Sequence, residues 1–524
     1  MRKFLFRYLI LFLLACLSAG GLQAQDLQLN PLFSDHGVLQ QELPVPVWGN
    51  AKPGKEVTVV FGSQTVSSKS SKEGDWMVVL APLTASAEPA EMTVTSEKET
   101  ITLKDILVGE VWVGSGQSNM AMAVKNTLDG EAMEAQALGK RFEQIRLFKV
   151  PVEGADVRMR KVESDWVLPT AQNVASFSAT AFYFARKLSD DRSVPVGIIQ
   201  SANGGTNAYS WINSKTLSSD PVAESIRSYW NSTVKAHPAA MEKYKAALAP
   251  WREKVKAAKA AGTKVEGRAP REPLGPTHVK RPAGHYNAMI APLQPFAIRG
   301  VIWYQGEANS RLPFYNGYKD LMLGLTEDWR EDWATATGGE VERRDFPFYM
   351  VQLPNFAGGD SVGWPMIREQ MLKFWQDGKN TGSVVSIDVG DATDIHPRNK
   401  KPVGERLASF ARGNVYGENL VYSGPIYKSL SISGDKAVLE FDHEGGGLRS
   451  LDGEELRNFE VADADGNFAE ATATIEGTSV IVKSESIPEP RAVRYAWKNN
   501  PEGINFGNRE GYPASPFRTD SWEE

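Results

Sequence analysis

A serine and a distant histidine with two aspartates before it are the residues of this sequence that could do chemistry together. Ser118 stands in the polar segment Gly114–Met120 after an apolar run, and His396 follows Asp391 and Asp394. A serine hydroxyl becomes a nucleophile when a histidine accepts its proton and a carboxylate orients that histidine. These residue types are therefore the parts of a serine hydrolase.

Each of these residues also has an ordinary structural interpretation. Ser118 stands where a helix could begin, and serine is a favoured helix N-cap; Asp391 and Asp394 are common turn residues. His396 is nevertheless the strongest base candidate of the six histidines, because it alone follows an apolar run with carboxylates directly before it. His285 is the reserve, since it precedes an apolar stretch that could border the site.

Two further polar loops could stabilise the oxyanion that forms when a serine attacks an ester. Gly204 and Gly205 could present a backbone N–H, and the amide of Gln305 or Asn309 could supply a second donor. In isolation, a double glycine is better interpreted as a turn, and Glu307 as an anchor for its neighbouring loop. The sequence has no paired-histidine, cysteine-cluster, acidic calcium-loop or glycine-rich phosphate motif, so we expect no metal and no cofactor.

The elements that must position these loops follow from the apolar runs before them. The runs are Ile106–Val113, Val196–Gln200, Val301–Tyr304, Phe348–Leu353 and Val384–Val389. Helical spacing appears in Ala179–Leu188 and Val403–Ala411. Continuous apolar strands that alternate with helices predict a parallel, doubly wound α/β sheet covered on both faces. Ligands bind outside the carboxyl ends of the strands in such sheets, so the polar loops should meet at one edge.

The pattern of apolar runs, turn residues and composition divides the chain into four parts. We predict a signal peptide over 1–24, an N-terminal β module over 25–105, a catalytic domain over 106–416 and a C-terminal β module over 417–524. Short apolar runs separated by turn residues indicate small antiparallel sandwiches in both modules. A stretch over about 235–280, rich in Ala, Lys and Pro, indicates a surface helix and loop inserted in the catalytic domain.

The N-terminal segment has the pattern of an export signal. A basic start, an apolar run over Leu9–Leu14 and small residues before Ala24 are typical of a secretory signal peptide cleaved after Ala24. The run is too short to be a comfortable membrane span, and no later stretch could be one. Cys16 is an alternative lipid-attachment site. The sequence thus predicts an exported protein, and leaves open whether it is periplasmic, cell-surface or extracellular.

The composition limits the classes of function. With 58 Lys and Arg against 64 Asp and Glu, the formal net charge is -6, which argues against nucleic acid as a partner because phosphate backbones select basic faces. The 42% of hydrophobic residues is enough for sizeable cores and argues against disorder. Oligomeric state is not visible in the sequence.

Four motifs in order resemble the sialate O-acetylesterase family, a branch of the SGNH (GDSL-type) carbohydrate esterases. They are Gly116–Met120, Gly204–Thr206, Trp303–Asn309 and Asp394–Pro397, and the resemblance extends through the β modules to Ser515–Asp520. It implies a flavodoxin-like three-layer sandwich with a parallel sheet, a Ser118 nucleophile, a His396 base and no cofactor. The implied activity is removal of acetyl groups from sugar hydroxyls, in sialic acids or in plant polysaccharides such as xylan.

Two departures from the superfamily pattern affect the site. The superfamily places its aspartate three residues before the histidine, where this sequence has Thr393; we favour Asp394 as the acid, with Asp391 as the alternative. The oxyanion loop is also altered, so we assign the amide donor to Gln305 first and to Asn309 second. Two rival functions stay open at this stage: a non-catalytic glycan-binding protein on this scaffold, and a lipase-like or thioester-cleaving SGNH enzyme.

Overall fold

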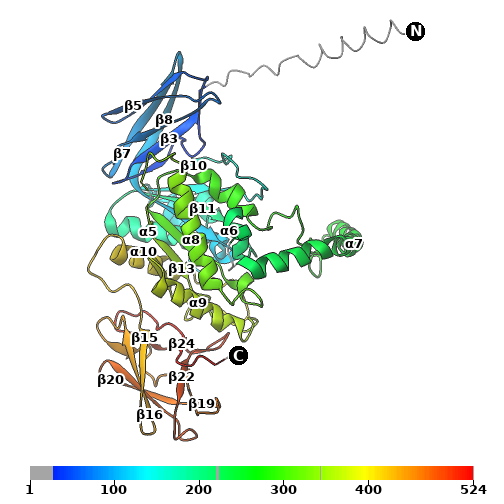
Figure 1. Ribbon diagram of the computed structural model, residues 1–524, viewed down its shortest axis with the longest axis vertical. Coiled ribbons are helices and arrows are strands. Elements are labelled where there is room, and N and C mark those ends of the chain that lie inside the picture. The colour runs from blue at the N-terminus through cyan, green and yellow to red at the C-terminus, as the bar shows by residue number, and fades with distance from the viewer. Residues whose placement is uncertain (1–26, 220–222, 343, 523–524) are drawn as a thin grey trace.

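The computed structural model describes residues 27–219, 223–342 and 344–522. The predicted signal peptide, its cleavage site at Ala24 and Cys16 lie outside the described residues. A β-rich part, a central α/β part and a second β-rich part follow one another along the long axis of the molecule (Figure 1). Over the described ranges, every helix is too short or too polar to cross a membrane.

A parallel sheet forms the centre of the molecule. Its strands are β8 (Glu99–Gly116), β11 (Val196–Ala202), β12 (Gly300–Tyr304), β13 (Phe348–Val351) and β14 (Thr381–Val384). They are neighbours in the order β11-β8-β12-β13-β14, which in chain order is 2-1-3-4-5. Beyond β11 the sheet is extended by β9 (Ile145–Lys149) and by the antiparallel edge strand β10 (Trp166–Val167). The first strand, β8, is therefore central, and the chain changes direction across the sheet beside it, where open α/β sheets bind their ligands.

Alternating residues of these strands face two hydrophobic cores. Val111 and Val113 pack in one core with Trp329, whereas Trp112 packs in the other with Phe184. One core is covered by α8 (Tyr318–Thr335) and α9 (Gly363–Asp377), the other by α5 (Ala179–Arg192) and α10 (Lys401–Asn414). Side chains that alternate between two apolar layers make continuous apolar strands, which is the pattern read from the sequence.

The sequence placed most of these elements correctly. The helices predicted over Ala179–Leu188 and Val403–Ala411 are confirmed as α5 and α10. The strand predicted over Val384–Val389 is wrong in its bounds, because β14 ends at Val384. Val385 and Ile387 are buried instead in the core of the C-terminal part, so burial against that part, rather than a strand ladder, accounts for their apolar character.

Among the residues that the structure describes, the remaining helices are short, with one exception. The short ones are α2 (Ser118–Ala121), α3 (Gly130–Leu138), α4 (Ala171–Ser176) and α6 (Ser214–Ser219). Helix α7 spans Glu224–Ala261, contains Pro238 and Pro250, and projects from the body of the molecule (Figure 1). It lies in the stretch where the sequence indicated a surface helix, and it begins before Lys235.

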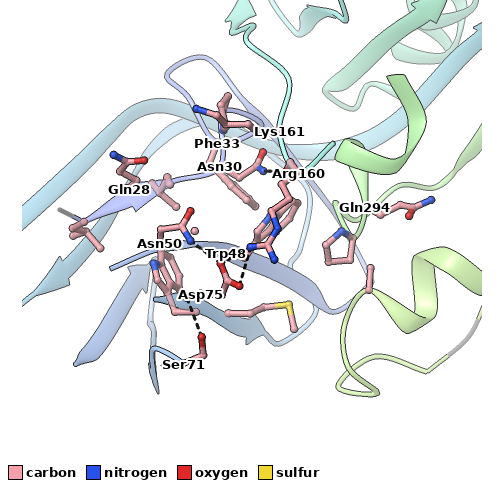
Figure 2. Close-up of a pocket in the computed structure, with 18 of the residues that line it drawn as sticks. Gln28, Asn30, Phe33, Trp48, Asn50, Ser71, Asp75, Arg160, Lys161 and Gln294 are labelled. Carbon is pink, nitrogen blue, oxygen red and sulfur yellow. Dashed lines mark hydrogen bonds and ion pairs between the residues drawn. The ribbon is translucent and has the colours of Figure 1, made fainter. Parts of the chain in front are cut away.

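The N-terminal part consists of two small sheets. Strands β1 (Gln28–Leu29), β3 (Val45–Asn50) and β6 (Asp75–Leu80) form one sheet. The other contains β2 (Val38–Gln40), β4 (Glu56–Phe61), β5 (Gln64–Lys69), β7 (Ser86–Ser96) and the first half of β8. Because β8 continues into the central sheet, the N-terminal part is joined to the amino-terminal edge of that sheet. A cavity of about 960 Å³ lies where β1, β3 and β6 meet residues 158–161 and 291–295 (Figure 2).

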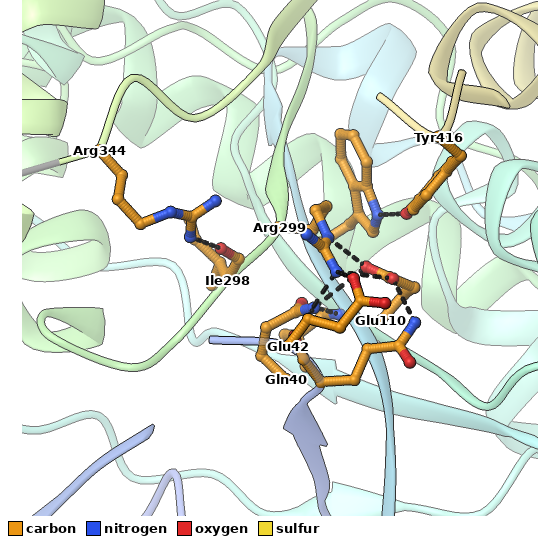
Figure 3. Close-up of polar contacts among 10 residues, drawn as sticks. Gln40, Glu42, Glu110, Ile298, Arg299, Arg344 and Tyr416 are labelled. Atoms are coloured by element: carbon orange, nitrogen blue, oxygen red, sulfur yellow. Dashed lines mark hydrogen bonds and ion pairs between the residues drawn. The ribbon is translucent and has the colours of Figure 1, made fainter. Parts of the chain in front are cut away.

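A buried ion pair fixes this junction. Glu110 is fully buried on β8, and Arg299 donates to both of its carboxylate oxygens, at 2.7 and 3.0 Å. Gln40 and Gln41 of the N-terminal part donate to the same carboxylate, and Arg299 also pairs with Glu42 at 2.9 Å (Figure 3). The charge of Glu110 is thus satisfied on several sides, as a buried carboxylate requires.

The C-terminal part is also built from antiparallel sheets. One contains β15 (Ile426–Ser433), β16 (Lys436–Asp442), β21 (Ser479–Lys483) and β20 (Thr472–Glu476). The other contains β19 (Phe468–Glu470), β18 (Phe459–Ala462), β22 (Ala492–Tyr495) and β24 (Phe517–Arg518), and β17 (Leu448–Ser450) pairs separately with β23 (Phe506–Asn508). Arg368 of α9 donates to the carbonyls of Lys498 and Asn499, which anchors this part to the central domain.

Candidate active site

Ser118 is placed at the carboxyl edge of the sheet by a tight turn after β8. Gly116 ends the strand with φ +130, and a Cβ added there would lie 2.2 Å from the carbonyl oxygen of Tyr304. The N–H of Gln117 donates to that same carbonyl at 2.9 Å. Helix α2 then begins at Ser118, which is partly exposed. Glycine at 116 lets the chain pass close to β12 and turn the serine towards solvent.

The double-glycine turn after β11 lies beside this serine. A Cβ added at Gly204 would lie 3.5 Å from the Cβ of Ser118, and Gly205 has φ +64. In the part of the chain that the structure describes, the N–H groups of Gly204 and Gly205 donate to no other protein group. The turn therefore brings two uncommitted backbone donors to the neighbourhood of the serine.

Asn119 connects the serine segment with the histidine loop. Its Nδ2 donates to the carbonyl of Ile395 at 3.0 Å and to Oε1 of Glu307 at 2.5 Å. Its Oδ1 accepts from Nζ of Lys400 at 2.6 Å. The residue after Ser118 and the residue before His396 are thus hydrogen-bonded to each other, so the loops that carry the two candidate residues meet.

The two candidate acids of the histidine loop have different environments. Nδ1 of His396 lies 3.7 Å from Oδ1 of Asp394, and that oxygen also accepts the backbone N–H of His396 at 2.9 Å. Oδ1 of Asp391 accepts instead from the N–H and hydroxyl of Thr393 and from the N–H of Asp394. The carboxylate of Asp391 organises the loop, and that of Asp394 lies against the imidazole.

The electrostatics keep the imidazole available as a base. Partial burial lowers the pKa of His396, with Asp394 acting to raise it and Lys400 to lower it. A histidine with a lowered pKa is neutral at physiological pH and can accept a proton.

The two candidate amide donors are fully buried and hydrogen-bonded within the protein. Nε2 of Gln305 donates to Oε1 of Gln117 at 3.2 Å, to the carbonyl of Thr206 at 3.0 Å and to Oδ1 of Asn309 at 2.8 Å. Nδ2 of Asn309 donates to Oδ1 of Asn207 at 3.2 Å. This environment differs from the expected one: the two amides tie together the loops that follow β8, β11 and β12, and the amide nitrogen of each already donates within the protein.

The reserve base, His285, lies behind the double-glycine turn. Its Nε2 is 2.8 Å from Nδ2 of Asn203, and its ring packs on Trp211 with centroids 4.8 Å apart. Burial, with Lys280 nearby, lowers its pKa to about 3. His285 is thus a neutral, buried side chain that supports the turn.

Lys400 is a site residue that the sequence did not reveal. It is 1% exposed, and burial lowers its pKa to about 7 although Glu307 and Asp394 act to raise it. Burial also raises the pKa of Glu307. In the sequence, Lys400 stands in the polar run Arg398–Lys401 at the start of a helix, which reads as an exposed face; its burial depends on tertiary contacts with Asn119.

Comparisons with known proteins point to one enzyme family. Residues 261–412 match the family model described as carbohydrate esterase, sialic acid-specific acetylesterase. The chain is 30% identical to the human sialate O-acetylesterase over 441 residues, with 78% of this chain and 74% of that protein covered. Identity to the mouse sialate O-acetylesterase is 29%, with 93% of each chain covered.

A solved structure is similar over nearly the whole chain. The crystal structure of XAC1771, a novel carbohydrate acetylesterase from Xanthomonas citri, superposes with a TM-score of 0.77 at 34% sequence identity. The superposition covers 94% of this chain and 100% of that one. The similarity therefore includes the β-rich parts as well as the central sheet.

Proposed function

This chain belongs to the sialate O-acetylesterase family and is a carbohydrate esterase, and we propose that it removes acetyl groups from sugar hydroxyls with Ser118 as nucleophile. The central sheet with its two helical layers is then an SGNH-type flavodoxin-like catalytic domain, flanked by two β-sandwich modules. We also propose that residues 1–24 are an export signal that is cleaved after Ala24.

The proposed reaction is a two-step acyl transfer. Nε2 of His396 takes the hydroxyl proton of Ser118 as the Ser118 oxygen forms a bond to the acetyl carbonyl carbon. The bond from that carbon to the sugar oxygen then breaks, and His396 returns the proton to the departing sugar alcohol. Water, deprotonated by the same imidazole, then attacks the acetyl carbon; the bond from that carbon to the Ser118 oxygen breaks, His396 returns the proton to this oxygen, and acetate leaves. Asp394 holds the imidazole by its Nδ1 side.

We assign the oxyanion donors to the backbone N–H groups of Gly205 and Gly204. They are uncommitted and lie in the turn beside Ser118, and preorganised donors of this kind are worth about 10²–10³ in kcat each. Gln305 and Asn309 contribute by fixing the loops, since an oxyanion would have to displace their present acceptors.

The observation that carries the proposal is the contact from Asn119 to Ile395. Ser118 and His396 are far apart in the sequence. This hydrogen bond, at 3.0 Å, joins their two loops at the residue after Ser118 and the residue before His396. Ser118 is the first residue of α2, and the N-cap position is Gln117, so the alternative that Ser118 serves as a helix N-cap does not hold.

A lysine beside the double-glycine turn favours a sugar that carries a carboxylate. Nζ of Lys280 lies 3.1 Å from the position that a Cβ on Gly205 would take. Among the described residues, no carboxylate pairs with Lys280, and burial together with Arg271 lowers its pKa. A partly buried cation without an acid partner matches the carboxylate of a sialic acid better than a neutral xylan chain.

Acetate release tests the proposal directly. Purified mature protein and its Ser118→Ala variant should be compared on 9-O-acetylated sialic acid, acetylated xylan and a small aryl acetate. Release from the sialic acid that is lost by at least about 10⁴-fold in the variant supports the assignment. Release from xylan alone would keep the mechanism and change the substrate, and full activity of a folded Ser118→Ala protein would refute it. Silence on all three substrates would favour a glycan-binding protein.

A further inference from the structure

The cavity at the N-terminal part has the lining of a glycan-binding site, and it is remote from the serine. Leu103 lines the cavity, and Ser118 follows the other end of the same strand, β8. At about 3.3 Å per residue, the length of chain between them is on the order of 40 to 50 Å, and the left-handed residue Asp105 (φ 55) makes the direct distance shorter than that. The cavity therefore cannot hold the same sugar whose ester is at Ser118.

Aromatic rings and side-chain amides line this cavity together. Phe33, Trp48 and Trp76 are among its lining residues, and Phe33 and Trp48 pack edge to face with centroids 5.0 Å apart. Asn30, Asn50 and Gln294 add amides (Figure 2), whose nitrogens already donate to the carbonyl of Arg160, to Asp75 and to the hydroxyl of Tyr286. Trp48 is the partly exposed ring of the three, whereas Phe33 and Trp76 are buried. A ring face accepts the apolar C–H face of a sugar, and an amide both donates to and accepts from its hydroxyls.

One buried donor in the lining lacks a partner. Trp76 is 3% exposed, and its Nε1 makes no hydrogen bond to any of the described residues. A buried indole N–H usually has a partner, because leaving it unsatisfied costs about 1–3 kcal/mol. Because this N–H is itself shielded from solvent, a hydroxyl or carboxylate oxygen would reach it only after the lining opens at Trp76.

The charged residues of the lining favour a glycan that carries carboxylates. Lys69, Arg158, Arg160 and Lys161 line the cavity, and among the described lining residues Asp75 is the one carboxylate; the formal net charge of the whole protein is -6. Arg160 pairs with Asp75 at 3.0 Å, and the Arg160 side chain is 81% exposed, so the guanidinium can turn to an incoming anion at small cost. Arg158 and Lys161 pair with Asp332 and Glu163, which lie outside the lining.

We propose that this cavity is a second, non-catalytic site that binds an acidic oligosaccharide, with Arg160 and Lys161 facing the sugar carboxylates and the aromatic residues facing the rings. Such a site would hold a polymeric substrate or its host surface while the catalytic domain works on another residue. The proposal concerns binding alone, so it stands or falls independently of the chemistry at Ser118.

Calorimetric titration of the mature protein tests it. The probes are a sialic acid tetramer, a galacturonic acid tetramer, neutral xylotetraose and a glutamate tetrapeptide. We expect binding of at least one acidic tetramer, a Kd raised about tenfold or more in Arg160→Gln/Lys161→Gln, and unchanged aryl acetate hydrolysis by that variant. Arg491→Gln, which removes an exposed arginine of the C-terminal part, is the matched control and should leave the Kd unchanged.

Four results would contradict the proposal, each in a different part. Binding that is unaffected by the double variant but abolished by Lys280→Met would place the sugar at the catalytic loops and overturn the proposal. Equal binding of xylotetraose would overturn the acidic selectivity, and equal binding of the peptide would overturn the sugar class. No binding of any tetramer would overturn the site altogether.

Discussion

At the scale of single residues, the protonation of the proposed base His396 is set first by its partial burial, which lowers its pKa, and then by two opposite charges. His396 lies between Asp394, which acts to raise its pKa, and Lys400, which acts to lower it. In the proposed mechanism the neutral imidazole is the active form, so we expect the acid limb of the kcat/KM profile to report the pKa of His396. Because that pKa is lowered, the limb should lie below the ordinary histidine value of about 6.5.

The two charges give a paired prediction for aryl acetate hydrolysis. Asp394→Asn removes the carboxylate that favours the charged imidazole, so its acid limb should move to lower pH. Lys400→Met removes the opposing cation, so its limb should move to higher pH. A pH series of kcat/KM for both variants checks the signs, and movement of both limbs in one direction would contradict the proposed arrangement.

Lys280 gives a prediction on substrate choice. Lys280→Met should raise KM for 9-O-acetylated sialic acid about tenfold or more, because a hydrogen bond to a charged group contributes about 1.5–3 kcal/mol. Its kcat/KM for the uncharged aryl acetate should stay unchanged, and Lys280→Arg should restore part of the sialate activity. An equal loss on both esters would mean that Lys280 supports the fold of the turn rather than the substrate.

At the scale of elements, the turn between β8 and α2 decides where the serine lies. Gly116→Ala would place a Cβ at φ +130 and 2.2 Å from a backbone oxygen of β12, so the strand or the turn must shift. We expect a loss of stability of about 1–3 kcal/mol or more and a fall in kcat of about 10²-fold, since small misplacements of a nucleophile are costly.

A glycine with the same backbone freedom but open surroundings is the control. Gly54 has φ +70 and no atom within 4 Å of an added Cβ, so Gly54→Ala should cost about 1 kcal/mol and leave kcat unchanged. Urea unfolding and kcat on the aryl acetate are the measurements. Equal effects of the two substitutions would show that the close approach to Tyr304 has no catalytic role.

Sequence patterns predicted these elements well where a strand or helix is apolar because of its own place in the central sheet or its helical layers. The strands before the polar loops are apolar because both faces of the sheet are covered, and α5 and α10 show their helical period. The strand predicted to continue after Val384 does not form, because the apolar residues Val385 and Ile387 are buried in the core of the C-terminal part instead. In the same way, Gln305 and Asn309 have the chemistry of oxyanion donors, but the acceptors that surround them come from distant loops, which no local pattern contains.

At the scale of the whole molecule, the buried Glu110–Arg299 pair holds the N-terminal part on the catalytic sheet. Arg299→Met would leave the fully buried carboxylate of Glu110 without its cation. Removing one partner of a buried pair typically costs about 3–5 kcal/mol, which urea unfolding would measure. Lys428→Met, which breaks an exposed pair with Asp442, should cost less than about 1 kcal/mol; similar losses would mean that the junction is not stabilised by this pair.

The central claim is that Ser118 carries the acyl group, and covalent labelling tests it most directly. The mature protein should be treated with a serine-directed fluorophosphonate, digested and mapped by mass spectrometry, beside folded Ser118→Ala and His396→Ala variants. We expect one adduct, on the peptide that contains Ser118, formed in parallel with the loss of acetate release. The His396→Ala variant should react with the fluorophosphonate much more slowly. An adduct on another serine that tracks the loss of activity, or labelling of Ser118 that leaves acetate release intact, would contradict it.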